Sequence, residues 1–369
     1  MLALAALATV CLSGTAAAAP PHVDARAVLV ENGTTGQVLY RYRAADRVPI
    51  ASITKLMTVL VTLQHARLSD VVVAPEQAAD VGESSIDLQA GERLTVRELL
   101  EAALIQSAND AAWALAYHVG RGSVPRFVAM MNAEARRLGL HDTHYVRPDG
   151  LDAPGHVSSA RDVTKLARIL MRRPVVRAIV AKRTATIPRR TLHTWNDLLW
   201  TYPGVIGVKT GHTSLAGWSE VAAARGRGLT LYATLLGSPS RDQRDADLAR
   251  LLTWGLGRFR YAPVISSGRA YATMTTGFGK GRVRLVASRP VYRAVRVGAP
   301  LMEETVAPRN ADLPVDRGER LGEVRVFQDG RLVAHRALVA DRSVARPSLL
   351  GRVGWYVGHA AHNVWSWVT

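Results

Sequence analysis

Cysteine and lysine are scarce in this sequence, and each scarcity excludes a class of protein. The 369 residues contain a single cysteine, Cys11, so a fold stapled by disulfides within the chain is excluded. Only five lysines contribute to the 47 Lys and Arg residues, which exceed the 30 Asp and Glu and give a formal net charge of +17. This charge is spread along the chain as arginine, without a basic helix or a nucleic-acid-binding motif. We therefore expect no nucleic-acid partner, and a diffuse attraction to an anionic membrane surface or polymer instead.

Metal-binding and nucleotide-binding motifs are missing as well. His141 and His144 lie close together in the sequence, but no HExxH or HxxEH frame surrounds them, so a surface loop is expected. The glycine-rich run 277–281 lacks the Lys-Ser/Thr ending of a phosphate-binding loop, and a hairpin turn is expected there. The sequence thus implies no metal ion and no cofactor.

The two ends of the chain carry apolar segments that predict export and membrane attachment. Residues 1–19 are apolar and end in four alanines, which is typical of a secretory signal peptide, although the usual basic start is missing. A buried helix or a lipid anchor at Cys11 is the alternative. Residues 346–368 mix tryptophan and aliphatic residues with Gly354 and Gly358, which predicts an amphipathic helix on a membrane surface rather than a spanning one. A helix docked on the protein is the alternative at this end.

The order of predicted strands and helices indicates an α+β domain followed by a small all-β domain. Residues 27–42 alternate like a β-hairpin, and residues 95–120 and 124–138 then place apolar positions at helical spacing. Strands return between residues 204 and 236, so a helical cluster is expected to be inserted into one sheet. Beyond Tyr261, short alternating strands are separated by Gly, Pro and Asp. The predicted parts are a signal peptide at 1–19, an α+β domain at 20–262, a β-rich domain at 263–342 and an amphipathic helix at 346–368.

Ser52 and Lys55 form the first pair of residues that suggests chemistry. They are three positions apart at the start of a predicted helix over 52–63, so the hydroxyl and the amine share one helix face. A neutral lysine can take the proton of a serine hydroxyl, and burial or a nearby cation lowers the lysine pKa enough for this. The helix N-terminus would favour negative charge on the reacting oxygen. Taken alone, the pattern also fits a capping serine and a surface lysine.

Two further motifs strengthen the chemical interpretation. Ser107 and Asn109 follow a predicted apolar helix and offer a hydroxyl and an amide for proton relay and carbonyl binding. Lys209, Thr210 and Gly211 end a predicted strand, against whose edge a peptide can lie. The patterns S-x-x-K, S-x-N and K-T-G occur in this order in penicillin-binding proteins and class A β-lactamases.

The three motifs and several other segments make the chain resemble the low-molecular-weight penicillin-binding proteins that act as serine-type D-alanyl-D-alanine carboxypeptidases. The resemblance extends from about residue 27 to residue 339. It implies a penicillin-binding, β-lactamase-like transpeptidase fold of the α+β class, a second β-rich domain and a C-terminal amphipathic anchor. The other segments that carry it are Ser107–Ala112, Met131–Ala135, Leu138–Leu140, Thr143–His144, Asp149–Leu151, Lys209–Thr213 and Ala216–Gly217.

This resemblance implies an activity and a location. The enzyme would remove the terminal D-alanine from peptidoglycan stem pentapeptides through an acyl-enzyme on Ser52, and β-lactams would inhibit it. Lys55 would be the general base, and Ser107 would pass the proton to the leaving amine. The protein is expected to be exported and to act at the extracytoplasmic face of the bacterial cell membrane. The implied substrate-binding residues are Asn109, Lys209, Thr210, Gly211, His212, Thr213 and Arg244, and the backbone N–H groups of Ser52 and His212 would form the oxyanion hole.

The carboxylate of the terminal D-alanine requires a cationic partner, and two arginines are candidates. The resemblance assigns this role to Arg244, whose guanidinium can pair with two oxygens at once. Arg241 lies three residues away and is the alternative. Trp195, Trp200 and Trp254 are expected in the hydrophobic core rather than at the substrate.

Two other functions remain as alternatives. A β-lactamase shares the acylation motifs, although such enzymes usually end soon after the K-T-G region. A non-catalytic penicillin-binding scaffold would keep the fold without any physical need for a buried pair of lysines. Endopeptidase activity on peptidoglycan cross-links uses the same bond chemistry and stays open.

Overall fold

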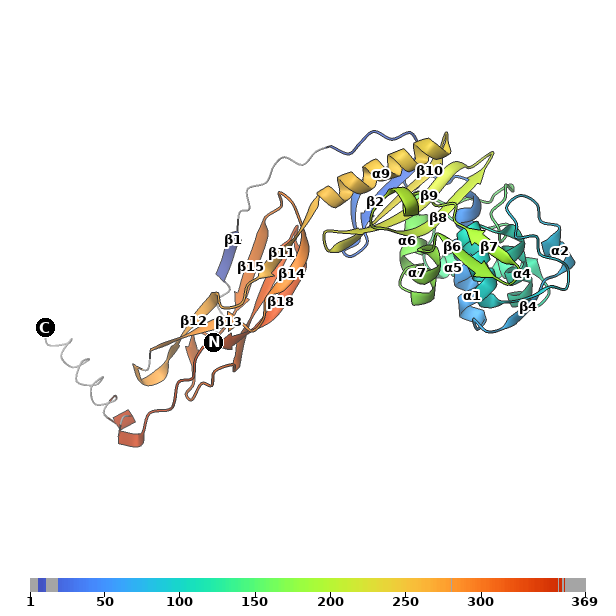
Figure 1. Ribbon diagram of the computed structural model, residues 1–369. Helices are drawn as coiled ribbons and strands as arrows, with labels where there is room; N and C mark the ends of the chain where they lie inside the picture. Colours follow the sequence, from blue (N-terminus) through green and yellow to red (C-terminus); the bar gives the residue numbers. More distant parts are fainter. Residues whose placement is uncertain (1–5, 11–18, 280, 351, 354, 356–369) are drawn as a thin grey trace. The chain divides into compact units, whose positions relative to one another are not determined.

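The chain divides into two compact units after Gly257 (Figure 1). The first unit contains the predicted α+β part, and the second contains the predicted all-β part, so the fold class is confirmed. The expected boundary after residue 262 falls inside strand β11 (Phe259–Ile265). The structure, a computed structural model, describes residues 6–10, 19–279, 281–350, 352–353 and 355.

A five-stranded antiparallel sheet forms the centre of the first unit. Its strands are β2 (Ala27–Asn32), β3 (Gln37–Tyr42), β8 (Val205–Thr213), β9 (Gly217–Gly226) and β10 (Leu229–Ser238). The spatial order β3-β2-β10-β9-β8 places β8, which contains the K-T-G motif, at one edge. β2 pairs with β10 across the intervening helical region, with Val30 opposite Ala233. This pairing confirms that the helices are inserted into a single sheet.

The helical region between β3 and β8 packs around α1. The elements of this region are η1 (Ala51–Thr54), α1 (Lys55–His65), β4 (Val71–Val73), α2 (Glu76–Ala79), β5 (Arg93–Thr95), α3 (Val96–Glu101), η2 (Ala102–Gln106), α4 (Asn109–Val119), α5 (Val124–Arg137), α6 (Ala160–Leu170), α7 (Pro174–Val180), β6 (Thr184–Ile187), β7 (Arg190–His193) and α8 (Leu198–Thr201). β4 pairs with β5 and β6 with β7 as two-stranded sheets, and α9 (Arg241–Gly257) follows β10. α1 is buried on all sides from Lys55 to Thr62, because α4, α5 and α6 all contact it. Thr95 and Glu98 form a capping box that starts α3. The helix predicted over 95–120 is interrupted, however, because Ser107 adopts a left-handed conformation with φ of 64°.

Helices cover both faces of the central sheet (Figure 1). Gly255 in α9 lies against Leu231 of β10, while Thr164 in α6 shares a hydrogen bond of 2.6 Å with Thr234 of the same strand. Leu231 and Thr234 are an odd number of positions apart, so they face opposite sides of the sheet. Because both faces are covered, every residue of β2 is buried.

The second unit is built on a seven-stranded sheet with the order β1-β15-β17-β18-β13-β12-β16, together with the pair β11-β14. Its strands are β1 (Ala6–Val10), β11 (Phe259–Ile265), β12 (Ala270–Thr276), β13 (Arg282–Ala287), β14 (Val291–Arg296), β15 (Leu301–Val306), β16 (Asn310–Ala311), β17 (Arg320–Gln328) and β18 (Arg331–Ala340). Val283 and Leu285, and likewise Val324 and Val326, are buried at every second position, as expected for strands with one face on a core. The glycine-rich run 277–281 joins the antiparallel strands β12 and β13, which confirms the predicted turn.

The expected terminal segments lie largely outside the described residues. Within the predicted signal peptide, Ala6–Val10 forms β1, which pairs antiparallel with β15, and the signal peptide stays a prediction. In the predicted amphipathic helix, Leu349 and Leu350 are helical, but residues 356–369 are outside the described part. No helix among the described residues is long and apolar enough to cross a membrane.

Candidate active site

Ser52 and Lys55 lie at the junction of η1 and α1. The Nζ atom of Lys55 is 2.8 Å from the Oγ atom of Ser52, as the three-residue spacing predicts. Lys55 is completely buried, whereas Ser52 is partly exposed. The serine can therefore meet a substrate while its amine partner stays beneath it, out of bulk water.

A second pair of lysine and serine lies beside the first. Lys209, on β8, places Nζ 2.8 Å from the Oγ atom of Ser107, and it also donates to the backbone carbonyl of Thr210 at 2.8 Å. Ser107 occupies the break between η2 and α4, where the left-handed backbone turns its hydroxyl toward β8. The interruption of the predicted helix thus serves the site directly.

Asn109 joins Lys55 to a surrounding loop. Its Oδ1 atom accepts a hydrogen bond of 2.7 Å from Lys55 Nζ, and its Nδ2 atom donates to the carbonyl of Gly82. The carbonyl of Asp149 accepts another hydrogen bond from Lys55 Nζ at 2.9 Å. Three oxygens from three separate segments therefore fix the position of this amine.

Burial changes the protonation of both lysines. Desolvation lowers the pKa of Lys55 to about 8, while the carboxylates of Asp149 and Asp110 oppose the shift. Desolvation, with repulsion by Lys55, also lowers the pKa of Lys209 well below its ordinary value. A lysine with a pKa near 8 exists partly as the neutral amine at pH 7, which is the form that can accept a proton.

Two glycines allow the backbone around Ser52 to pack closely. A Cβ atom on Gly211 would lie 2.8 Å from the carbonyl of Ile50 and 3.1 Å from the Ser52 nitrogen, so β8 can approach η1 only with glycine here. A Cβ atom on Gly150, which has φ of +90°, would lie 2.0 Å from the carbonyl of Ala51. Ala51 itself has φ of 49°, an unusual conformation for alanine that is held by this packing.

A pocket of about 190 Å³ opens above Ser52. Trp195 is 45% exposed and lines this pocket, so the expectation that it belongs to the core is wrong. Trp200 is also exposed, at 57%, whereas Trp254 packs edge-on against Tyr40. The residues lining the pocket are Ser52, Glu83, Ser84, Ser107, Asn109, Trp195, Thr210, Gly211, His212, Trp218, Arg241 and Arg244.

Arg244 reaches the pocket from α9 and is surrounded by acidic groups. Its Nε atom is 2.8 Å from Asp245 Oδ1 and 3.3 Å from Glu220 Oε2. Complete burial raises the pKa of Glu220 to about 8, because desolvation outweighs the attraction of Arg244. Partial burial likewise raises the pKa of Asp245 to about 6.

His212 and Thr213 differ in their relation to the pocket. His212 lines it and stacks on Trp218, with ring centroids 4.0 Å apart. The hydroxyl of Thr213 donates instead to Asp152 at 2.7 Å, and Thr213 is not among the lining residues. The structure thus brings together the other predicted site residues and leaves Thr213 apart.

Several supporting residues were not identified from the sequence as parts of the site. Asp110 accepts hydrogen bonds from the backbone of Ile86 and Leu88 and so fixes the loop that lines the pocket. The carboxylate of Asp149 binds Arg147 through two hydrogen bonds of 2.6 and 2.8 Å, which hold its carbonyl against Lys55. Asp110 directly follows the S-x-N motif, and Asp149 begins the resembling segment Asp149–Leu151; these were the available signals. The contact between Lys55 and the Asp149 carbonyl is long-range, so no spacing in the sequence predicts it.

His156 is a neutral imidazole that supports η1 through a hydrogen bond to Thr54. Its Nδ1 atom accepts from the backbone nitrogen of Val146 at 3.1 Å, so its Nε2 atom carries the proton and donates to Thr54 Oγ1 at 2.7 Å. Burial lowers the pKa of His156 to about 4, which agrees with this neutral form.

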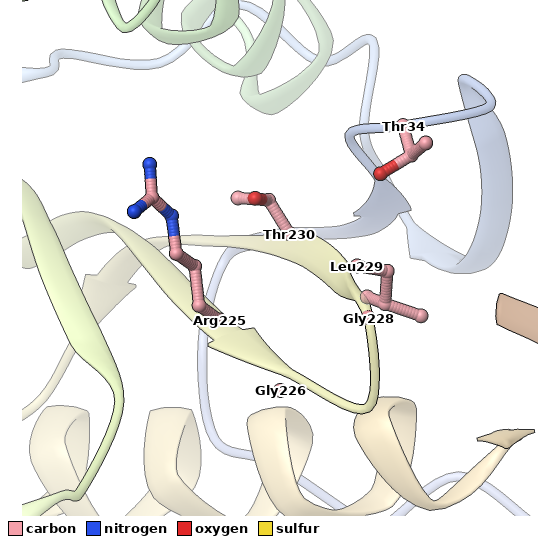
Figure 2. A pocket seen from close by; sticks show the side chains of 6 residues that line it. All are labelled: Thr34, Arg225, Gly226, Gly228, Leu229 and Thr230. Carbon is pink, nitrogen blue, oxygen red and sulfur yellow. The ribbon is translucent and has the colours of Figure 1, made fainter. Parts of the chain in front are cut away.

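A second groove, of about 460 Å³, lies at the turn between β9 and β10 (Figure 2). Arg225 is its charged lining residue, and the hydroxyls of Thr34 and Thr230 have no lysine or carboxylate beside them among the lining residues. This groove therefore lacks a base that could activate a nucleophile. Within the described part of the chain, no group of three or more His, Cys, Asp or Glu residues is placed to hold a metal ion.

Comparisons with known proteins agree with this geometry. A family model described as D-alanyl-D-alanine carboxypeptidase matches residues 14–240, and one described as the C-terminal domain of penicillin-binding protein 5 matches residues 259–346. The D-alanyl-D-alanine carboxypeptidase DacD of Salmonella typhimurium is 32% identical over 359 residues, which cover 93% of this chain and 92% of that protein. Penicillin-binding protein 5 of Haemophilus influenzae is 27% identical, with a TM-score of 0.66 over 89% of this chain and 100% of that structure. The Streptomyces K15 DD-transpeptidase is 32% identical, with a TM-score of 0.63 over 65% of this chain and 100% of that structure.

Proposed function

The chain belongs to the D-alanyl-D-alanine carboxypeptidase family of serine peptidases, and on that premise we propose that Ser52 attacks the bond between the last two D-alanines of peptidoglycan stem pentapeptides. The chain is a serine-type hydrolase with a penicillin-binding transpeptidase fold and the C-terminal β domain of the same proteins. The roles of individual residues proposed below rest on the contacts in the site.

Lys55 is the base that activates Ser52 in this proposal. Its neutral amine, 2.8 Å from the serine Oγ, takes the hydroxyl proton as Oγ bonds to the carbonyl carbon of the penultimate D-alanine. Asn109 and the carbonyl of Asp149 keep the amine aimed at Ser52 throughout. The site needs no cofactor for this step, because the lysines and hydroxyls supply the proton transfers.

The oxyanion that forms is held by backbone N–H groups of Ser52 and His212. β8 is the edge strand of its sheet, so its outer side is available to a substrate peptide that lies along it as an added strand. Thr210, Gly211 and His212 lie on that strand and line the pocket, and Asn109 faces the acyl part of the substrate from the opposite wall. Backbone donors fixed in this way typically contribute a factor of about 10² to 10³ to the rate.

Ser107 completes the proton path to the leaving group. Its hydroxyl, bound to Lys209 at 2.8 Å, donates a proton to the departing amine of D-alanine as the C–N bond breaks. Ser107 then regains the proton that Lys55 took from Ser52, so Lys55 is again a neutral amine and Ser107 again a hydroxyl. Water then attacks the ester on Ser52, its proton returning to the amine of Lys55 and then to Oγ, and the shortened peptide leaves with a new carboxylate. A β-lactam would acylate Ser52 in the same way and inhibit the enzyme. Arg244 provides the cation for the terminal carboxylate of the substrate.

The observation that carries the proposal is the pair of buried lysines bonded to two serines on one pocket. A non-catalytic scaffold has no need for two desolvated amines. The β-lactamase alternative is disfavoured because the match to the carboxypeptidase DacD covers 93% of this chain and 92% of that protein. The test is release of D-alanine from a stem-pentapeptide mimic. The full chain should release it and the Ser52→Ala variant should not; equal release by both would contradict the proposal.

The same proposal includes a location at the extracytoplasmic face of the cell membrane. The predicted signal peptide at 1–19 and the predicted amphipathic helix at 346–368 support it. Deleting the residues after Pro347 should release the enzyme from membranes and leave its activity intact. A truncated protein that still sediments with membranes would contradict the attachment.

A further inference from the structure

Trp195 and Arg241, which the mechanism above does not use, form one wall of the active-site pocket, and Asp197 binds Arg241 behind it. The guanidinium of Arg241, at the start of α9, lies 5.2 Å from the ring centroid of Trp195. It also binds both carboxylate oxygens of Asp197, at 2.6 and 2.7 Å. Trp195 in turn donates its indole N–H to the carbonyl of Gln106 at 3.0 Å. The wall is thus tied to the residue that directly precedes Ser107.

Arg241 is the more accessible of the two arginines that line the pocket. Its side chain is 32% exposed, whereas that of Arg244 is 2% exposed. Arg244 is also engaged by Asp245 at 2.6 Å and by Glu220 at 3.3 Å. Asp197 occupies the Nε and Nη2 atoms of Arg241, so the Nη1 amino group can bind another anion.

The two arginines are linked through one carboxylate oxygen. Oδ2 of Asp197 lies 2.6 Å from Arg241 Nε and 3.7 Å from Arg244 Nη2. Both guanidiniums are therefore held near one another, and both line the pocket. The Trp195 ring and the two hydrogen bonds to Asp197 together hold the guanidinium of Arg241 in place, which lowers the entropy lost when it binds a ligand.

We propose that Arg241 is a second carboxylate-binding residue, which holds the C-terminal carboxylate of the substrate together with Arg244, and that Trp195 and Asp197 are its positioning residues. The inference rests on the proposed function of Ser52 and deepens it. It makes the Trp195–Arg241 wall a determinant of selectivity for peptides with a free C-terminal carboxylate. Charge-assisted hydrogen bonds of this kind contribute enough to change kcat/KM by about 10- to 100-fold.

The test compares an N-acylated L-Lys-D-Ala-D-Ala tripeptide with the same tripeptide carrying a C-terminal carboxamide. Arg241→Gln should lower kcat/KM for the free acid by about 10-fold or more, mainly through KM, and change that for the carboxamide less than about twofold. Arg250→Gln, on the same helix and paired with Asp247, is the matched control and should behave like the unmodified enzyme.

A double variant separates direct binding from disturbance of Arg244. Arg241→Gln removes the two hydrogen bonds to Asp197 and leaves this carboxylate facing Arg244 alone; combining it with Asp197→Asn removes that charge. The double variant should keep the selective loss on the free acid. Trp195→Ala should reproduce part of that loss. Trp195→Phe should keep the kcat/KM of the unmodified enzyme for the free acid, because a phenyl face can still stack on the guanidinium.

Two results would overturn the inference. Equal losses on the acid and the carboxamide would show a general structural defect, and recovery of the free-acid rate in the double variant would assign the effect to the unpaired aspartate. Failure of the proposed function looks different, because the unmodified enzyme would then hydrolyse neither peptide and would not be acylated on Ser52 by benzylpenicillin.

Discussion

Replacing Lys55 by arginine tests the role of the buried amine in activating Ser52. Desolvation lowers the pKa of Lys55 from 10.5 to about 8. At pH 7 about one molecule in ten then carries the neutral amine, whereas an unshifted lysine would be neutral in about one molecule in 3,000. An arginine keeps the positive charge and can still donate to Ser52, but it stays protonated at any accessible pH.

The assay is the second-order rate constant for acylation by benzylpenicillin between pH 6 and 9. For the unmodified enzyme, this constant should rise about tenfold per pH unit below pH 8 and level off above it, because only deprotonated Lys55 accepts the serine proton. Lys55→Arg should lose a factor of about 10² to 10⁴ and show no such rise. Folding of the variant is checked by its thermal unfolding midpoint. A pH-independent rate in the unmodified enzyme, or a preserved rise in Lys55→Arg, would refute the reasoning.

Other predictions concern the support of the site. Burial lowers the pKa of His156 to about 4. As the pH falls below about 6.5, this histidine is therefore protonated in the unfolded chain but stays neutral in the folded protein. The free energy of unfolding should fall by up to about 3 kcal/mol towards pH 4. Chemical denaturation should show a flatter pH dependence for His156→Gln, whereas the exposed His141→Gln should match the unmodified protein. Gly211→Ala would place a methyl group 2.8 Å from the Ile50 carbonyl and should slow acylation about 100-fold or more, while Gly257→Ala, with open space around it, should not. Unchanged acylation in Gly211→Ala would show that β8 can move away from η1 without harm.

Local spacing was sufficient to predict the central pair of the site. Ser52 and Lys55 are three positions apart at a helix start, which puts them on one helix face, and the order of the three motifs favoured the observed contact over a capping serine and a surface lysine. Alternation predicted the strand that carries Lys209, and the order of helices and strands predicted the single sheet. The contact of Ser52 with Lys55 and the existence of the strands depend on neighbours in sequence, which is why a sequence pattern contains them.

The features that were missed depend on contacts between distant segments. The sequence predicted that Ser107 follows an apolar helix, but not the left-handed turn there, because contacts with Lys209 and the Ala102 carbonyl hold this turn and no glycine marks it. Trp195 was expected in the core on the basis of its size, but it lines the pocket beside Arg241, which belongs to another element. The close packing of Gly150 against Ala51 joins segments about 100 residues apart and could not be derived from either one.

The most direct test of the central claim is intact-protein mass spectrometry after incubation of the full chain, and of its Ser52→Ala variant, with benzylpenicillin. The account predicts a mass gain of one penicilloyl group on the unmodified protein and none on the variant. If the folded, unmodified protein carried no adduct and also did not hydrolyse benzylpenicillin, an acyl-enzyme on Ser52 would be contradicted.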